Sequence, residues 1–217
     1  MTTENGRQAA KPRLVVLGGG GHAKVAIETI RDAGLYDIAG FLDRPAAGDM
    51  VLEVRRLGDD SLLPSLAASG ITHAFPAVGS NKVRVRLGRR ARQTGLELAN
   101  AISPFAYVSK SARIGDGVLV VAGAILNAET IVEDFAVINT NASVDHDGHI
   151  GIGAHIAPRS VLAGKVTVGE QALVGVGATV LPDVTIGANA IIGGGSCVVS
   201  DIPDGATAYG VPARVVS

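Results

Sequence analysis

Residues 161–180, VLAGKVTVGEQALVGVGATV, belong to a six-residue repeat that runs without interruption from Ile102 to Val198. Counted in steps of six from Ile102, all seventeen positions are isoleucine, leucine or valine. The residue two places before such a position is usually small, as at Ala142 and Ala178. A period of six matches neither an α-helix nor a hairpin, and it therefore indicates a repeat architecture.

If each unit is a short strand plus a corner, three units form a triangular coil of about eighteen residues, and coils stack about 4.8 Å apart. We expect the large apolar residue to point inward at each corner and the small residue to fit the crowded turn beside it. Burial then accumulates by stacking. The pattern resembles the hexapeptide repeat, and the resemblance implies a left-handed parallel β-helix, an exception to the usual right-handed crossover. Such a repeat specifies a scaffold and not a reaction.

The length of 217 residues allows two modest domains, and we expect the domain boundary where the repeat begins. We expect a flexible N-terminus at residues 1–12, an α/β Rossmann-like domain at residues 13–101, and the β-helix with a C-terminal tail at residues 102–217. The formal net charge of −1 argues against a nucleic-acid-binding protein, because such binding relies on neutralising phosphates.

The cysteine count and the distribution of apolar residues bear on the expected location of the protein. Cys197 is the only cysteine, so no internal disulfide is possible. Residues 1–12 are polar and lack the apolar core of a signal peptide. No apolar run approaches the ~20 residues that a membrane span requires. We therefore expect a cytoplasmic protein without membrane contact.

The N-terminal domain begins with a strand, a glycine turn and a helix. Arg13 to Leu17 is an apolar strand, Gly18 to His22 form the turn, and a helical pattern ends at Gly34. Such a turn brings backbone N–H groups close to a phosphate. Its motif, Gly18-x-Gly20-x-x-Ala23, resembles a dinucleotide fingerprint but is weak alone, because a tight turn that binds nothing also needs glycine.

A second strand, from about residue 37 to 42, ends in Asp43 and Arg44, where an acidic side chain reaches a nucleotide in Rossmann-like folds. A third strand leads into Gly79 and Ser80, and Ser80 is a good N-cap for a helix that extends to Thr94. We interpret the basic run on that helix as a solvated face.

About ninety residues are too few for a complete dinucleotide site, so one nucleotide or one nucleotide-linked sugar fits this domain better. The turns that follow its strands meet at the carboxyl edge of the sheet, where such ligands bind. They contain the candidate substrate-binding residues Gly20, Gly21, His22, Asp43, Arg44, Gly79 and Ser80.

Polar residues concentrate in one part of the repeat. Three of the five histidines fall between positions 146 and 155. His146 is the second residue after the apolar position Val144, where a side chain should point outward, and Asp145 and Asp147 flank it. A carboxylate on one ring nitrogen fixes the tautomer and raises the basicity of the other, as a general base requires.

Two other interpretations of these histidines remain open. His146 could be an exposed polar residue without a catalytic role. A zinc site is the second, because hexapeptide helices include carbonic anhydrases with three histidine ligands. The spacings among His146, His149 and His155 do not match that family's pattern, so we expect no metal.

The combined motifs resemble one family more specifically. A Gly-Gly-His turn, an Asp-ended second strand, a Gly-Ser-Asn turn, coils with Asn-Thr-x-x-x-Val-Asp-His-Asp and a closing Gly-Val-Pro-Ala are similar to the sialic-acid and bacillosamine acetyltransferases. The similarity extends from about Arg13 to Val215. It implies acetyl transfer from acetyl-CoA to a sugar, including UDP- and GDP-linked 4-amino sugars, by a homotrimer.

The resemblance also implies roles for single residues. His146 would be the general base and Asp147 the acid that tunes it, although Asp145 also has an acidic counterpart in some members. His155 would contact the thioester region of acetyl-CoA. Further coenzyme contacts would fall on Gly164, Val176, Gly194, Pro212 and Ala213. Gly20 and Arg44 differ from many relatives, which leaves guanine and uracil both open.

The resulting hypothesis is an acetyl-CoA-dependent N-acetyltransferase acting on the 4-amino group of a nucleotide-linked amino-deoxy sugar, such as GDP-perosamine or a UDP-4-amino sugar. The alternative within enzymes is O-acetylation of sialic acid or a related sugar hydroxyl, which needs no nucleotide. A non-catalytic trimeric nucleotide-binding scaffold is the alternative from another class. It predicts no response to acetyl-CoA.

Overall fold

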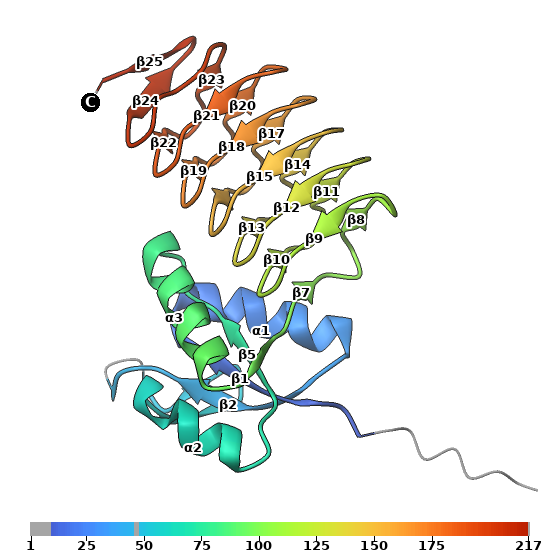
Figure 1. Ribbon diagram of the computed structural model, residues 1–217, viewed down its shortest axis with the longest axis vertical. Helices are drawn as coiled ribbons and strands as arrows, with labels where there is room; N and C mark the ends of the chain where they lie inside the picture. Colours follow the sequence, from blue (N-terminus) through green and yellow to red (C-terminus); the bar gives the residue numbers. More distant parts are fainter. Residues whose placement is uncertain (1–9, 46–47, 217) are drawn as a thin grey trace, which may run out of the picture.

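The computed structural model describes residues 10–45 and 48–216. An α/β part comes first along the chain, and a stack of short strands follows it (Figure 1). The C-terminus lies at the far end of the stack. Of the N-terminal segment that we expect to be flexible, residues 1–9 lie outside the described residues.

The α/β part is built around one sheet with strand order β3-β4-β2-β1-β5-β6, parallel except for the hairpin of β3 and β4. Its elements are β1 (Arg13–Leu17), α1 (Gly21–Ala33), β2 (Asp37–Leu42), β3 (Met50–Val51), β4 (Val54–Gly58), the 3-10 helix η2 (Asp60–Leu62), α2 (Leu63–Ala68), β5 (His73–Pro76), α3 (Asn81–Gln93) and β6 (Glu97–Leu98). The first two strands have the predicted bounds, and α1 ends at Gly34 as predicted.

Helices cover both faces of this sheet. Leu14 and Val16 pack with α1, whereas Val15 and Leu17 pack on the side of α2 and α3, as the two-residue period of a strand requires. Gly18 follows β1 with a φ of 122°, and a Cβ there would lie 2.7 Å from the carbonyl oxygen of Ala77. Only glycine therefore fits at the start of the turn.

The second part is a parallel β-helix. Its coils are made of two-residue strands: β7 (Ala101–Ile102), β8 (Tyr107–Val108), β9 (Arg113–Ile114), β10 (Leu119–Val120), β11 (Ile125–Leu126), β12 (Ile131–Val132), β13 (Val137–Ile138), β14 (Ser143–Val144), β15 (His149–Ile150), β16 (His155–Ile156), β17 (Val161–Leu162), β18 (Thr167–Val168), β19 (Leu173–Val174), β20 (Thr179–Val180), β21 (Thr185–Ile186), β22 (Ile191–Ile192) and β23 (Cys197–Val198). The hairpin of β24 (Thr207–Gly210) and β25 (Ala213–Val215) ends it.

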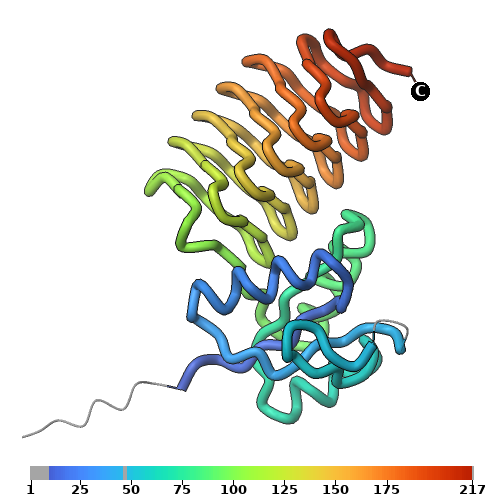
Figure 2. The backbone as a smooth tube through the Cα atoms, turned by 180° about the vertical axis from the view of Figure 1, so that it is seen from behind, coloured from blue at the N-terminus to red at the C-terminus, as the bar shows by residue number. Residues whose placement is uncertain are grey.

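Every third strand pairs with a register of eighteen residues, as in Leu119 with Val137, which gives three walls. We call the wall with β7, β10, β13, β16, β19 and β22 wall 1, the wall with β8, β11, β14, β17, β20 and β23 wall 2, and the wall with β9, β12, β15, β18 and β21 wall 3. Figure 2 shows the coils as successive rungs.

The large apolar residue of each repeat is the second residue of a strand, so it lies on a wall. The prediction that it lies at a corner is wrong, because the turns fall two to three residues later. From Val120 to Val198 these residues are buried, and so are small residues such as Ala142, which follows a turn. Both kinds of residue fill one core.

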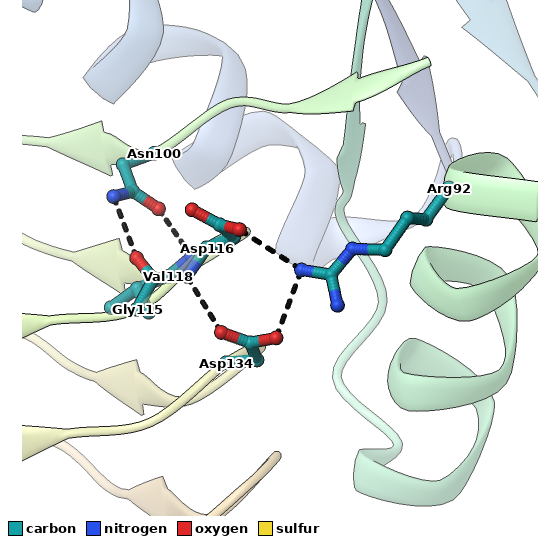
Figure 3. A network of polar contacts seen from close by, with 6 residues as sticks. All are labelled: Arg92, Asn100, Gly115, Asp116, Val118 and Asp134. Carbon is teal, nitrogen blue, oxygen red and sulfur yellow. Dashed lines mark hydrogen bonds and ion pairs between the residues drawn. The ribbon is translucent and has the colours of Figure 1, made fainter. Parts of the chain in front are cut away.

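The α/β part docks on the edge between walls 3 and 1. Outward-facing residues of wall 1, such as Leu119 and Val137, pack into the same cluster as α1. On α3, Arg92 donates to Asp116 at 3.0 Å and to Asp134 at 2.9 Å, and Asn100 bonds to the backbone of the first coil (Figure 3).

The prediction of a solvated basic helix is wrong for part of α3. Arg84 is only 1% exposed, and Arg92 bridges to the β-helix. Carbonyl and carboxylate oxygens at the coil turns supply the partners, and a sequence does not reveal that α3 faces them. No helix among the described residues is long and apolar enough to cross a membrane.

Candidate functional site

His146 occupies the turn between walls 2 and 3, directly after β14. Its side chain is 55% exposed and points outward, as predicted. Nδ1 lies 2.8 Å from Oδ2 of Asp147. Because the carboxylate can only accept, Nδ1 carries the proton in that hydrogen bond, and Nε2 of the neutral ring keeps a free lone pair.

The two flanking carboxylates have different partners. Asp145 accepts from the backbone N–H of His146 at 2.7 Å and from Nδ2 of Asn127 at 3.0 Å, and the bond to His146 lowers the pKa of Asp145. The hydrogen bond to Asp147 is the main cause that raises the pKa of His146 above 6.5. Asp147 therefore pairs with the ring, whereas Asp145 holds the turn.

Gly164 lies one coil beyond His146, against its imidazole. A Cβ on Gly164 would lie 2.6 Å from both Cε1 and Nε2 of the ring. The backbone N–H of Lys165 also donates to the carbonyl oxygen of His146 at 2.9 Å. The ring of His146 thus fits in this position because Gly164 has no side chain. The sequence predicted only a coenzyme contact for Gly164 and not this one with His146.

A cavity of about 560 Å³ lies between the start of α3 and wall 1. The predicted residues Gly79, Ser80, His155 and Val176 all line it. Ser80 is the N-cap residue of α3, but its side chain makes no capping hydrogen bond, contrary to the prediction. The structure thus joins residues that we assigned separately to substrate and to coenzyme.

A second histidine, His22, lies next to His155, which lines this cavity. His22, in the first turn of α1, lies 6.1 Å from His155 between ring centroids. Burial, followed by the charge of Arg84, lowers the pKa of His22 to about 4 and that of His155 to about 3. Nδ2 of Asn139 lies 3.0 Å from Nε2 of His155 and donates to it when that ring is neutral.

The other turns of the α/β part lie around a smaller cavity of about 320 Å³, lined by Gly18, Asp43 and Arg44 among others. The carboxylate of Asp43 accepts from the backbone N–H groups of Gly19 and Arg44, each at 2.7 Å. Gly20 and Gly21, which start α1, have open space around them. Asp43 therefore also shapes the glycine turn.

The remaining candidate residues lie toward the C-terminal end of the β-helix. Val176 and Gly194 occupy equivalent turns of successive coils between walls 1 and 2, and Val176 is 57% exposed. Pro212 lies in the turn of the C-terminal hairpin, whereas Ala213 is buried in the core of the β-helix.

His146 and His155 lie on opposite sides of one chain. His155 belongs to β16 on wall 1, and His146 lies at the edge between walls 2 and 3. In a triangular prism, that edge is opposite wall 1. The structure therefore does not bring the predicted base and the predicted thioester contact together within one copy.

His149 lies on wall 3, where its Nε2 pairs with Oε1 of Glu133 at 2.9 Å. The three clustered histidines thus have three separate partners on three sides of the prism. Within residues 10–45 and 48–216, no group of three or more His, Cys, Asp or Glu residues is arranged to hold a metal ion.

Sequence reasoning missed Asn127, Asn139 and Arg84. Asn127 was detectable, because it precedes Asp145 by the eighteen residues of one coil. Asn139 is the first residue of the quoted Asn-Thr motif, and its contact with His155 depends on side-chain geometry. Arg84 gave no signal, because it looks like its basic neighbours on α3.

Comparison with known families gives two matches. Residues 13–91 match the PglD N-terminal domain, and residues 165–199 match the bacterial transferase hexapeptide (six repeats). Both matches fall within the parts that the structure describes as α/β and β-helical.

Solved structures match nearly the whole chain. Perosamine N-acetyltransferase from Caulobacter crescentus, crystallised with CoA and GDP-perosamine, is 48% identical over 96% of this chain and 99% of its own, with a TM-score of 0.92. Its variants with one histidine replaced by Asn or Ala were crystallised with the same ligands. The acetyltransferase domain of PglB from Neisseria gonorrhoeae FA1090, in complex with acetyl coenzyme A, is 36% identical over 95% of this chain and all of its own, with a TM-score of 0.90.

WeeI from Acinetobacter baumannii AYE, at 22% identity and a TM-score of 0.85 over 95% of this chain and 100% of its own, shares the fold. The β-helix has the left-handed, hexapeptide-repeat form of these relatives. At 48% and 36% identity over nearly the full length, the chain belongs to the family of hexapeptide-repeat sugar acetyltransferases with a PglD-type N-terminal domain.

Proposed function

We propose that the protein transfers an acetyl group from acetyl-CoA to the 4-amino group of a nucleotide-linked amino-deoxy sugar, with GDP-perosamine as the first candidate. The observation that carries the proposal is His146, an exposed imidazole whose Nδ1 is held by Asp147. The 48% identity to a perosamine N-acetyltransferase supports the choice of substrate.

His146 supplies the base that amide formation needs. Bound acetyl-CoA supplies the thioester; the amine nitrogen bonds to its carbonyl carbon, and the carbon–sulfur bond breaks. Nε2 of His146 takes the proton that the amine loses and returns it to the departing sulfur, so that CoA leaves as a thiol. Asp147 keeps the ring oriented and stabilises the imidazolium that forms meanwhile.

The edge between walls 1 and 2 suits the coenzyme. A Cβ on Gly177 or Gly195 would meet no atom within 4 Å, so the backbone of these turns is open. Exposed peptide groups suit the amides of a pantetheine arm. We assign Val176 and Gly194 to this contact and the Pro212–Ala213 turn to the adenine end.

The nucleotide fits the carboxyl edge of the α/β sheet. Gly20 and Gly21 open α1 toward solvent, where N–H groups suit a diphosphate. Asp43 and Arg44 line the smaller cavity, which suits the base, and we assign the sugar to Gly79 and Ser80 at the larger cavity, with His22 close to Gly79.

A complete site needs a second copy of the chain, because His146 lies opposite the cavity of His155. We propose a homotrimer in which the base of one copy meets the cavity of its neighbour. Wall 2 supports this arrangement, since its outward side chains Tyr107, Ile125 and Val161 are apolar and 60%, 40% and 46% exposed.

We also place the reaction in the cytoplasm, where acetyl-CoA is made.

An activity panel tests the substrate class. The purified protein is given acetyl-CoA with GDP-perosamine, with a UDP-4-amino sugar or with free sialic acid, and the released CoA thiol is measured. We expect turnover with a nucleotide-linked 4-amino sugar and none with sialic acid. Turnover of sialic acid alone would establish O-acetylation instead, and no thiol release with any acceptor would favour a scaffold.

A further inference from the structure

Arg84 is a buried cation without a carboxylate partner among the described residues. It lies in the first turns of α3, is 1% exposed, and its pKa is lowered to about 10 by burial. The salt bridges of α3 involve other arginines, such as Arg92 with Asp116 and Asp134. A charge in such a place is stable only when hydrogen bonds replace its water.

The hydrogen bonds of Arg84 extend into both parts of the molecule. Nε donates to the carbonyl of Phe135 at 2.8 Å, and Nη2 donates to that of Gly153 at 2.8 Å, both on turns of the β-helix. On the other side, Nη1 donates to the carbonyls of Val78 at 3.0 Å and Gly79 at 3.2 Å, and Nη2 to Oδ1 of Asn81 at 2.9 Å.

We propose that Arg84 is a positioning residue that ties the loop of residues 78–81 to the β-helix and so fixes the cavity that His155 lines, together with His22, which lies beside His155. The planar guanidinium fork reaches both sides at once, which a lysine ammonium does not. Gly79, Ser80 and Asn81 line that cavity, so a shift of this loop changes its shape. The proposal rests on the proposed function for its kinetic consequence.

The charge of Arg84 has a second effect in the same place. Burial and the charge of Arg84 both lower the pKa of His22 and of His155, and together they keep the two rings neutral. Lys82 is the other cation at the cavity, and no acidic residue is among the described residues that line it. Without Arg84, the loop opens, water reaches the rings, and both histidines take up protons at higher pH.

Three variants of the full chain test this assignment. Arg84→Met removes the charge and the fork, Arg84→Lys keeps only the charge, and Arg92→Met removes another arginine of α3 that bridges to the β-helix. For each, NMR titration of the histidine Cε1–H signals follows His22 and His155, assigned by single His→Gln variants. Steady-state kinetics with acetyl-CoA and GDP-perosamine follow kcat and KM.

In Arg84→Met, we expect both histidines to titrate nearer pH 6.5 and kcat/KM to fall about 100-fold, mainly through KM for the sugar nucleotide. Arg84→Lys should raise the histidine pKa values less than Arg84→Met, because it keeps the charge, but it should lose kcat/KM as well, because one ammonium cannot hold both sides. Arg92→Met should match the unchanged protein in both measurements.

A folded Arg84→Met protein with unchanged titration and kinetics would overturn the proposal. An Arg92→Met protein with the same changes in titration and kinetics that we expect for Arg84→Met would overturn it as well. If Arg84→Met does not fold, by circular dichroism, an Arg84→Lys protein with full kcat/KM overturns it instead. If the unchanged protein turns over no nucleotide-linked sugar, the proposed function fails, and the titrations still decide whether Arg84 fixes the cavity.

Discussion

His146, the base that we propose, contacts two neighbours. Asp147 sets its tautomer, and the absent side chain of Gly164 leaves room for its ring. Each contact leads to a separate prediction, because one acts on the pKa of the base and the other on its position.

Asp147→Asn should move the acid limb of kcat/KM to lower pH. A base works only when unprotonated, so the limb follows the pKa of His146, which Asp147 raises above 6.5. The plateau should also fall about 100-fold, since the neutral amide no longer fixes the tautomer. Asp145→Asn is the control: its carboxylate contacts the backbone N–H of His146 and not the ring, so the limb should shift less.

The measurement is the pH dependence of kcat/KM for the three proteins with one substrate, whose own amine titrates alike in each. If the acid limb stays at the same pH in Asp147→Asn, or if Asp145→Asn shifts it more, then the hydrogen bond from His146 to Asp147 does not set the pKa of the base during catalysis.

Gly164→Ala should lower kcat about 100-fold with little change in the melting temperature, because the added methyl displaces the imidazole of His146. Steady-state kinetics and a coenzyme A thermal-shift assay separate this effect from a coenzyme contact. A variant with normal kcat but a raised KM for acetyl-CoA would show that Gly164 serves the coenzyme alone.

At the scale of elements, α3 decides how the two parts meet. Gly88, in the middle of α3, lies against the ring of Phe135, which is 1% exposed and cannot move aside easily. The β-carbon of an alanine would overlap that ring. Glycine is a poor helix former, but at this position it allows α3 to approach the β-helix closely.

Overpacking in Gly88→Ala should cost about 2–3 kcal/mol, because the added β-carbon overlaps a buried ring, and alanine regains ~1 kcal/mol in helix propensity, so the net destabilisation should be about 1–2 kcal/mol. Urea unfolding measures the change. Gln93→Ala, at the exposed end of the same helix, is the matched control and should be nearly neutral. An equally stable or more stable Gly88→Ala protein would mean that α3 does not dock as described.

Much of this architecture was predictable from local patterns. The six-residue period identified the β-helix, because each coil repeats the same local burial. The alternation and glycine signals gave β1, α1 and β2 their bounds. The docking of α3 was not predictable, since Arg84 and Arg92 find their partners on turns 24 to 69 residues away in the chain.

The candidate site shows the same division. The exposed position of His146 followed from its distance to Val144, but its ring partner required coordinates. One signal was present and unused: His146 and His155 are nine residues apart, half of an eighteen-residue coil, which places them on opposite sides.

At the scale of the whole molecule, one copy holds His146 and the cavity of His155 on opposite sides. The proposed base His146 lies at the edge between walls 2 and 3, and the cavity that His155 lines lies on wall 1, with His22 beside His155. In the homotrimer that we propose, each boundary would join the base of one copy to the cavity of the next. The account therefore requires catalysis to depend on two copies.

Co-expression of two inactive chains tests this requirement most directly. One chain carries His146→Ala, the other His22→Ala with His155→Ala, and different tags isolate the mixed assemblies. Each chain alone should lose about 100-fold or more in kcat. In a mixed trimer, one boundary joins an intact His146 to an intact cavity, so CoA release with GDP-perosamine should return to roughly one third of the unchanged protein. Mixed assemblies as inactive as either parent would contradict a site shared between copies.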